Sequence, residues 1–287
     1  ASVERIQEHL DVLCADIGTR LAASEAERQA AEYCRDYLAA LGLSGATIEA
    51  FPFHLWGYET CEVTVDLGGG PRGLEAVPVA NSPASGEVIE AELVYVDNAL
   101  PGDLARVDPR GKVLLIWGGY GQDTSRLEAL NASGAAGLIW VDERLPFDWP
   151  VSIGTPYDWR DICRLPQVGI SWADGWEIAA ALDAGAKARV RLFSDVCSRA
   201  AQSWNAFAEL PGSSDEFVHI GGHIDSVVVG TGADDDASGV AVTLEVARLL
   251  AEAGVGPLRT VRFCCFGAEE QLSEGSRQYV LAHEDDL

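Results

Sequence analysis

Basic residues are scarce in this sequence, and methionine is absent altogether. The chain has 287 residues, with 20 lysine and arginine residues against 45 aspartate and glutamate residues, and its formal net charge at pH 7 is −25. A surface this acidic repels nucleic-acid phosphates and anionic lipid, so the sequence predicts neither a nucleic-acid partner nor a membrane-surface partner. The absence of methionine has no evident physical reason.

Long apolar runs and paired cysteines are missing too. No stretch approaches the ~20 consecutive apolar residues of a membrane-spanning helix. The opening residues, 1–5, lack the basic and apolar regions of a signal peptide. The seven cysteines are odd in number and include no C-x-x-C pair, which argues against a disulfide framework and a thiolate zinc site. We therefore expect a cytoplasmic protein, with a secreted mature form as the alternative.

The N-terminal region predicts helices followed by strands. A chain of this length suggests about two domains, each able to bury a core. Residues 1 to about 43 predict two amphipathic helices, and Ser24-Glu-Ala-Glu27 is a capping-box pattern that starts the second one. Residues 46–53 and 60–67 predict two strands.

The middle of the chain, residues 76–195, has short apolar runs separated by proline, glycine and aspartate, and this pattern favours a small β-rich module. Strands are predicted at 92–96, 112–117, 138–141 and 166–171, and helices at 124–132 and 174–183.

The C-terminal region alternates strand, helix, strand and helix. Residues 217–221 predict a strand, a helix ends at Gly254, and 260–266 predict a buried strand in which Cys264 and Cys265 face opposite sides as core residues. This alternation predicts parallel strands joined by right-handed crossovers. Ligands of such sheets bind beyond the carboxyl ends of the strands.

Metal-ligating residue types follow these strands. His223-Ile-Asp225 ends one strand, Asp234-Asp235-Asp236 lies in the loop after it, and Glu269-Glu270 follows the next strand. Imidazole and carboxylate together suit zinc, and a carboxylate can bridge two ions. Each motif alone is more often a surface pair, a solvated loop or an exposed turn, but together they indicate a metal site.

These motifs resemble those of the di-zinc exopeptidases of the aminopeptidase Y and glutamate carboxypeptidase II type. The family pattern occurs here as Gly221-Gly-His-Ile-Asp-Ser226, Gly232-Ala-Asp-Asp-Asp-Ala-Ser-Gly239, Phe263-Cys-Cys-Phe-Gly-Ala-Glu-Glu270 and Gly275-Ser-Arg-Gln-Tyr279. Ile17-Gly-Thr-Arg20 and Ala30-Ala-Glu-Tyr33 also look like the family's opening segment. Residues 76–195 resemble the protease-associated domain inserted in many members.

The resemblance implies an α/β fold in which helices cover a mainly parallel sheet. Residues 1–75 and 196–287 would form the zinc exopeptidase-like catalytic domain, and 76–195 the inserted protease-associated-like domain. It further implies that His223 binds one zinc ion, Glu270 the other, and Asp235 both. Asp225 would orient His223, and Glu269 would be the general base.

Some positions depart from the family pattern. Asp236 stands where the family usually has Asn, and Asp234 is expected to be a supporting carboxylate. The family's two remaining ligands, an Asp after the next strand and a more distant His, have no match. His283 is better explained as a polar residue at a helix end. We therefore expect a catalytic domain that is incomplete at its C-terminal end, as a fragment or as one chain of a split enzyme.

The leading functional hypothesis is a zinc-dependent exopeptidase that acts on a peptide with a free terminus. No arginine-rich pocket for a substrate carboxylate is visible, and the acidic cluster suits an ammonium group, so an aminopeptidase is favoured. The chain could form a homo-oligomer or pair with a complementary C-terminal chain. The alternatives are a non-catalytic binding protein that keeps the fold, as the transferrin receptor ectodomain does, and a single-zinc acyltransferase like the glutaminyl cyclases.

Overall fold

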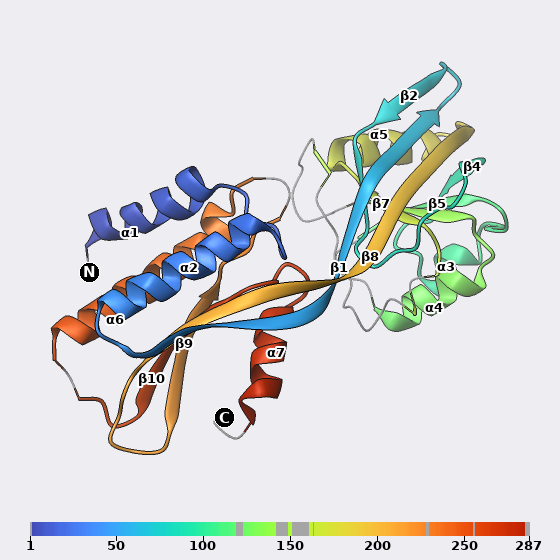
Figure 1. Cartoon of the computed structure of the whole chain (residues 1–287). Helices are drawn as coiled ribbons and strands as arrows, with labels where there is room; N and C mark the ends of the chain where they lie inside the picture. Colours follow the sequence, from blue (N-terminus) through green and yellow to red (C-terminus); the bar gives the residue numbers. More distant parts are fainter. Residues whose placement is uncertain are drawn as a thin grey trace. The chain divides into compact units, whose positions relative to one another are not determined.

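The chain divides into two compact units, Ala1–Leu55 with Arg199–Leu287 and Trp56–Ser198 (Figure 1). A computed structural model describes residues 2–118, 123–141, 149–150, 161–162, 164–227, 230–254 and 256–284. The first boundary lies within one long strand, β1 (Ser44–Asp66), where the sequence predicts two separate strands. The assignment of residues 1–75 with 196–287 and of 76–195 to catalytic and protease-associated-like domains stays a prediction.

Helices from both ends of the chain pack together in the first unit. α1 (Val3–Leu10) continues into a π-helical segment, η1 (Asp11–Ile17), and α2 (Glu25–Ala40) follows. This confirms the two predicted N-terminal helices. The Ser24 hydroxyl accepts a hydrogen bond from the Glu27 N–H and starts α2. The Glu27 side chain does not complete the predicted capping box, because its carboxylate bonds to other groups. α6 (Ser238–Glu252) lies beside α2 (Figure 1).

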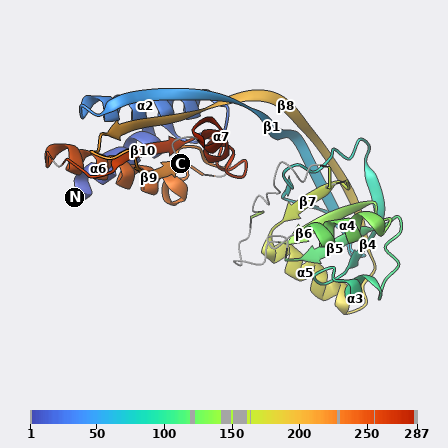
Figure 2. The same cartoon turned by 90° about the horizontal axis from the view of Figure 1, so that it is seen from below.

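The sheet of the first unit is mixed. β9 (Phe217–His223) and β10 (Thr260–Phe266) are parallel, as predicted for strands joined by a helix. β10 also pairs with β8 (Ala188–Leu210), and this pairing is antiparallel. β8 in turn neighbours β1, and Figure 2 shows these two long strands side by side. The sheet is therefore less parallel than the sequence predicts.

The two faces of this sheet carry different helices. Phe263 and Cys265 on β10 belong to one core cluster with Leu38 of α2 and Leu244 of α6. Cys264 belongs to another cluster with Tyr279 of α7 (Glu274–Ala282). Successive residues of a strand point to opposite faces, and this confirms the prediction that Cys264 and Cys265 are core residues on opposite sides.

In the second unit β4, β5, β6 and β7 are parallel to one another, and β4 also pairs antiparallel with β8, so these strands continue the sheet that contains β8. The predicted strands and helices of this region are confirmed within a few residues. The elements are β2 (Pro71–Leu74), β3 (Ala76–Pro78), β4 (Ile89–Tyr95), α3 (Pro101–Leu104), β5 (Val113–Trp117), α4 (Thr124–Ala132), β6 (Gly137–Val141), β7 (Gln167–Ile170) and α5 (Trp172–Asp183). Within the described part of the chain, no helix has the length and apolar character needed to cross a membrane.

Candidate metal centre

His223 is the last residue of β9, where the strand leaves the sheet next to the end of β10. Its Nδ1 lies 3.2 Å from the backbone carbonyl oxygen of Asp225 and 3.4 Å from that residue's carboxylate. A proton on Nδ1 can be donated to this carbonyl, which leaves Nε2 as the ligand atom. Nε2 lies 2.9 Å from Oδ1 of Asp235 and 3.7 Å from Oε2 of Glu269.

Asp225 is fully buried, and its carboxylate holds the segment that follows β10. Oδ1 accepts a hydrogen bond from the Glu269 N–H at 2.9 Å, and Oδ2 accepts one from the Glu270 N–H at 3.0 Å. One carboxylate thus contacts His223 and fixes the backbone of two further candidate residues. The sequence predicts only the first of these contacts.

Asp235 lies at a kink in η3 (Ala233–Ala237), where its own backbone is not helical, and its side chain is 80% exposed. The neighbouring Asp236 accepts hydrogen bonds from the N–H groups of His223 and Gly239, both at 3.1 Å. A Cβ at Gly222 would lie 2.6 Å from Oδ2 of Asp236, so only glycine leaves room for this contact. Asp236 thereby connects the loop that carries Asp235 to the end of β9.

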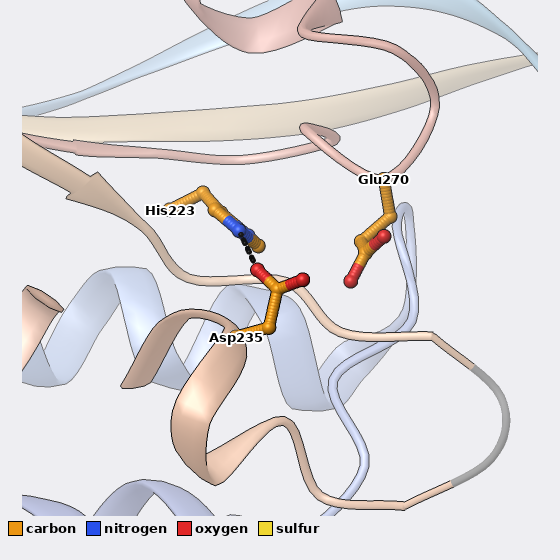
Figure 3. Close-up of side chains that lie close together, drawn as sticks. All are labelled: His223, Asp235 and Glu270. Atoms are coloured by element: carbon orange, nitrogen blue, oxygen red, sulfur yellow. Dashed lines mark hydrogen bonds and ion pairs between the residues drawn. The ribbon is translucent and has the colours of Figure 1, made fainter. Parts of the chain in front are cut away.

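Glu270 completes a group of three candidate ligands. One ligand atom each from His223, Asp235 and Glu270 lies within 4.8 Å of the others. Figure 3 shows the three side chains pointing toward a common centre, from the end of β9, from η3 and from the segment after β10. The sequence motifs lie far apart in the chain, and folding brings them together at the carboxyl ends of two parallel strands, where ligands of such sheets bind.

The charges around this centre favour a cation. Burial by itself lowers the pKa of His223, but Asp225, Asp235 and Glu269 outweigh this effect and raise the pKa to about 10. Burial, followed by repulsion from Asp225 and Asp235, raises the pKa of Glu270 to about 7. In the metal-free protein the surrounding carboxylates thus favour protonated His223, and a metal ion that binds there would displace this proton. An imidazole nitrogen with carboxylate oxygens is also a donor set that zinc prefers, so the residues present fit the metal that the sequence predicts.

Two other candidates from the sequence lie outside this group. Asp234 is exposed and is not one of the three converging residues, although it precedes Asp235 directly. His283 follows the last residue of α7, and its Nε2 lies 2.9 Å from a carboxylate oxygen of Glu49. The structure therefore places His283 where a polar helix-end residue is expected.

Other residues that support the site were not singled out by the sequence. Arg20 is fully buried and donates hydrogen bonds to backbone carbonyl oxygens on both sides of the His223–Asp235 loop, including those of Ile224 at 2.6 Å and Thr231 at 2.8 Å. Glu27 and Asn205 accept hydrogen bonds from the segment that leads into Glu269. Arg20 stands in the segment that looks like the family opening, which is the only signal the sequence offers for it.

Known proteins are similar to this chain both in sequence and in fold. Residues 205–286 match peptidase family M28. An aminopeptidase of Pseudomonas aeruginosa is 28% identical over 310 residues, which cover 97% of this chain and 53% of the relative. Carboxypeptidase Q of Xenopus laevis is 26% identical over 299 residues, covering 99% of this chain and 62% of the relative. The crystal structure of a peptidase M28 precursor from Shewanella amazonensis has a TM-score of 0.83 at 25% identity, and the match covers 99% of this chain and 70% of that one.

The family match is confined to residues 205–286, whereas similarity to the aminopeptidase, to carboxypeptidase Q and to the M28 precursor structure extends over nearly the whole chain. The matched family region contains every residue of the candidate metal centre, whereas Arg20 and Glu27 precede it. The chain spans about half the length of the first of these curated relatives.

Proposed function

We propose that this chain carries the metal centre of a zinc-dependent M28 exopeptidase, which hydrolyses a terminal peptide bond. The observation that supports this most directly is the convergence of His223, Asp235 and Glu270, with their ligand atoms within 4.8 Å of one another. His223 and Glu270 would each hold one of two zinc ions, and Asp235 would bridge them. Bound zinc supplies a Lewis acid for the scissile carbonyl and lowers the pKa of a coordinated water.

Glu269 is proposed as the general base. Its Oε2 lies 3.7 Å from Nε2 of His223, and the Ser273 hydroxyl donates a hydrogen bond to its Oε1 at 3.2 Å. The carboxylate is 39% exposed, so a water molecule and a substrate can reach it. Glu269 would take a proton from the attacking water and return it to the leaving amine, a role that contributes typically 10²–10⁴-fold to the rate.

A centre with two zinc ions needs more ligands than these three residues provide. The Asp and the His that the sequence resemblance implies have no counterpart among the described residues. We propose that the further ligands come from outside the part of the chain that the structure describes. A cytoplasmic location and assembly with further chains also stay predictions.

The substrate terminus is proposed to be the amino end. The relatives include both an aminopeptidase and a carboxypeptidase, so similarity alone leaves the choice open. Asp234 is exposed and directly precedes the proposed bridging ligand, and its negative charge suits a substrate ammonium group. Hydrolysis of leucine p-nitroanilide, with no cleavage of its N-acetylated form, would agree with this proposal. Cleavage of an N-blocked dipeptide instead would make the protein a carboxypeptidase.

Zinc binding tests the proposed centre independently of the substrate. We expect isothermal titration of the metal-free protein with Zn²⁺ to show binding that Asp235→Asn weakens by at least about 10-fold, because a ligand oxygen is lost. Asp234→Asn is the matched control, since it removes the same charge from the neighbouring exposed residue. Equal loss of affinity in both variants would mean that only the general negative charge attracts zinc, and would overturn the proposal.

A further inference from the structure

Successive backbone N–H groups after β10 are all bonded to side-chain oxygens. The Gly267 N–H donates to Oδ1 of Asn205 at 3.1 Å, and the Ala268 N–H donates to Oε1 of Glu27 at 2.8 Å. The next two N–H groups, of Glu269 and Glu270, donate to the Asp225 carboxylate. We call residues 267–270 the 267–270 segment. Hydrogen bonds thus fix the backbone of this segment to side chains on β8, on α2 and after β9.

Glu27, like Asp225, is fully buried, and both of its carboxylate oxygens accept hydrogen bonds. Besides the Ala268 N–H, Oε1 accepts the Ser203 hydroxyl at 2.7 Å, and Oε2 accepts the Ala23 N–H at 2.7 Å. All three donors are neutral groups, and burial raises the pKa of Glu27 to about 8. Burying a carboxyl group is costly unless it makes such bonds, so an acid at this position calls for a reason beyond starting α2.

The 267–270 segment packs closely against the carboxyl group of Glu27. A Cβ at Gly267 would lie 2.7 Å from Oε1 of Glu27 and 2.6 Å from the carbonyl oxygen of Trp204, so glycine is needed for the close approach. Ala268 has a φ of 49°, in the left-handed region that residues other than glycine rarely adopt. The hydrogen bond that the Ala268 N–H donates to Oε1 of Glu27 holds Ala268 in this conformation. The two residues that follow are Glu269 and Glu270.

We propose that Glu27 is a positioning residue for Glu269 and Glu270, fixing the 267–270 segment so that the base and the ligand reach the metal centre. This inference rests on the proposed function of the two glutamates. Glu27 touches neither substrate nor metal in this arrangement, and it acts through the backbone of Ala268. Residues that orient metal ligands in this way typically account for 10–100-fold in affinity or activity.

The test compares Glu27→Gln with two controls. Gln keeps the shape but places an NH2 group against an N–H donor of either Ala23 or Ala268, so one hydrogen bond is lost. Ser203→Ala removes a bond to the same Oε1 and leaves the bond to Ala268 in place. Glu32→Gln alters a half-exposed residue of the same helix. For Glu27→Gln we expect kcat to fall by about 10–100-fold and Zn²⁺ affinity by at least about 10-fold, with KM within about twofold. Both controls should stay within about threefold of the wild type.

Backbone hydrogen exchange provides a readout that needs no activity. In metal-free Glu27→Ala, which removes both acceptor oxygens, the Ala268 amide should exchange at least about 10-fold faster than in Ser203→Ala, while amides inside β10 stay protected. If Glu27→Gln does not fold, Glu27→Asp serves with the same readouts, because it keeps the charge and shortens the reach. Unchanged kcat, zinc affinity and Ala268 exchange would overturn the inference. A wild-type protein that neither binds zinc nor cleaves any substrate would overturn the proposed function instead, and exchange at Ala268 would then decide the role of Glu27 alone.

Discussion

The Cα of Gly275 packs directly against the backbone carbonyl oxygen of Gly267, and a methyl group at position 275 would overlap that oxygen. Asn205 joins the same two residues, because its Oδ1 accepts the Gly267 N–H at 3.1 Å and its Nδ2 donates to the Gly275 carbonyl at 2.9 Å. The first turn of α7 therefore rests on the segment that leads into Glu269 and Glu270. This contact explains the glycine at position 275, whereas Gly267 is required by its own close approach to Ser203, Trp204 and Glu27.

Gly275→Ala should destabilise the first unit. The added methyl group would overlap Gly267 and lie 2.7 Å from Oδ1 of Asn205, and overpacking of this kind costs about 1–3 kcal/mol. Urea unfolding measures the change. Gly256→Ala is the control, since nothing lies within 4 Å of a Cβ at that position. Equal stability of the two variants would contradict the packing described for Gly275.

Replacing Glu269 or Glu270 by glutamine should distinguish the proposed general base from the proposed metal ligand. We expect Glu269→Gln to lower kcat by about 10²–10⁴-fold because the base is lost, with Zn²⁺ affinity within about threefold of the wild type. We expect Glu270→Gln to weaken Zn²⁺ binding by at least about 10-fold, because a ligand oxygen is replaced. Steady-state kinetics and calorimetry on both variants give the comparison. The reverse pattern would exchange the roles assigned to the two residues.

Zinc binding should release protons and strengthen as the pH rises. In the metal-free protein the pKa of His223 is raised to about 10 and that of Glu270 to about 7. At pH 8 the imidazole therefore still carries a proton that the metal must displace, while Glu270 is mostly ionised. Calorimetry in two buffers of different ionisation enthalpy should show about one proton released at pH 8 and more than one at pH 6.5. No proton release at pH 8 would contradict the combination of a raised pKa and zinc ligation at His223.

The same raised pKa values predict how the metal-free fold responds to pH. For Glu27, His223 and Glu270 the pKa is higher in the folded state than its ordinary value, so the folded state binds more protons. The stability that these groups contribute is complete below their unfolded pKa values and is lost as the pH rises through the folded values. Urea unfolding of the metal-free protein should show lower stability at pH 9 than at pH 5. Constant stability across that range would contradict these shifts.

Asp236→Asn should destabilise the fold. Both oxygens of Asp236 accept backbone N–H groups, from His223 and Gly239. An amide offers only one acceptor oxygen, so one buried N–H would face another donor, at a cost of about 1–3 kcal/mol. Asp234→Asn, at an exposed neighbour, should change stability by less than about 0.5 kcal/mol. Similar urea midpoints for both variants would argue against this double contact.

Local patterns in the sequence were sufficient for most of the helices and strands and for the candidate ligands. Apolar periodicity locates α2, α6 and β10, and alternation along β10 places Cys264 and Cys265 on opposite faces. The three acidic and histidine-containing motifs indicate a site because strand ends in α/β sheets meet at one edge, and the resemblance to di-zinc exopeptidases selects His223, Asp235 and Glu270 within them. The sequence predicts two strands where β1 is continuous, because turn-forming residues within Ser44–Asp66 suggest a break. Pairing with β8 keeps the strand continuous in the structure.

Only the tertiary structure decided the role of Glu27 and the mixed character of the sheet. In the sequence Glu27 stands at the third position of a helix and looks like a capping residue, but its hydrogen bond to Ala268 joins residues 241 positions apart. The antiparallel pairing of β8 with β10 likewise depends on distant segments. The sequence by itself determined which residues could bind a metal, because that depends on chemical type and local spacing. Tertiary packing decided which buried groups hold those residues in place, because such partners leave no local pattern.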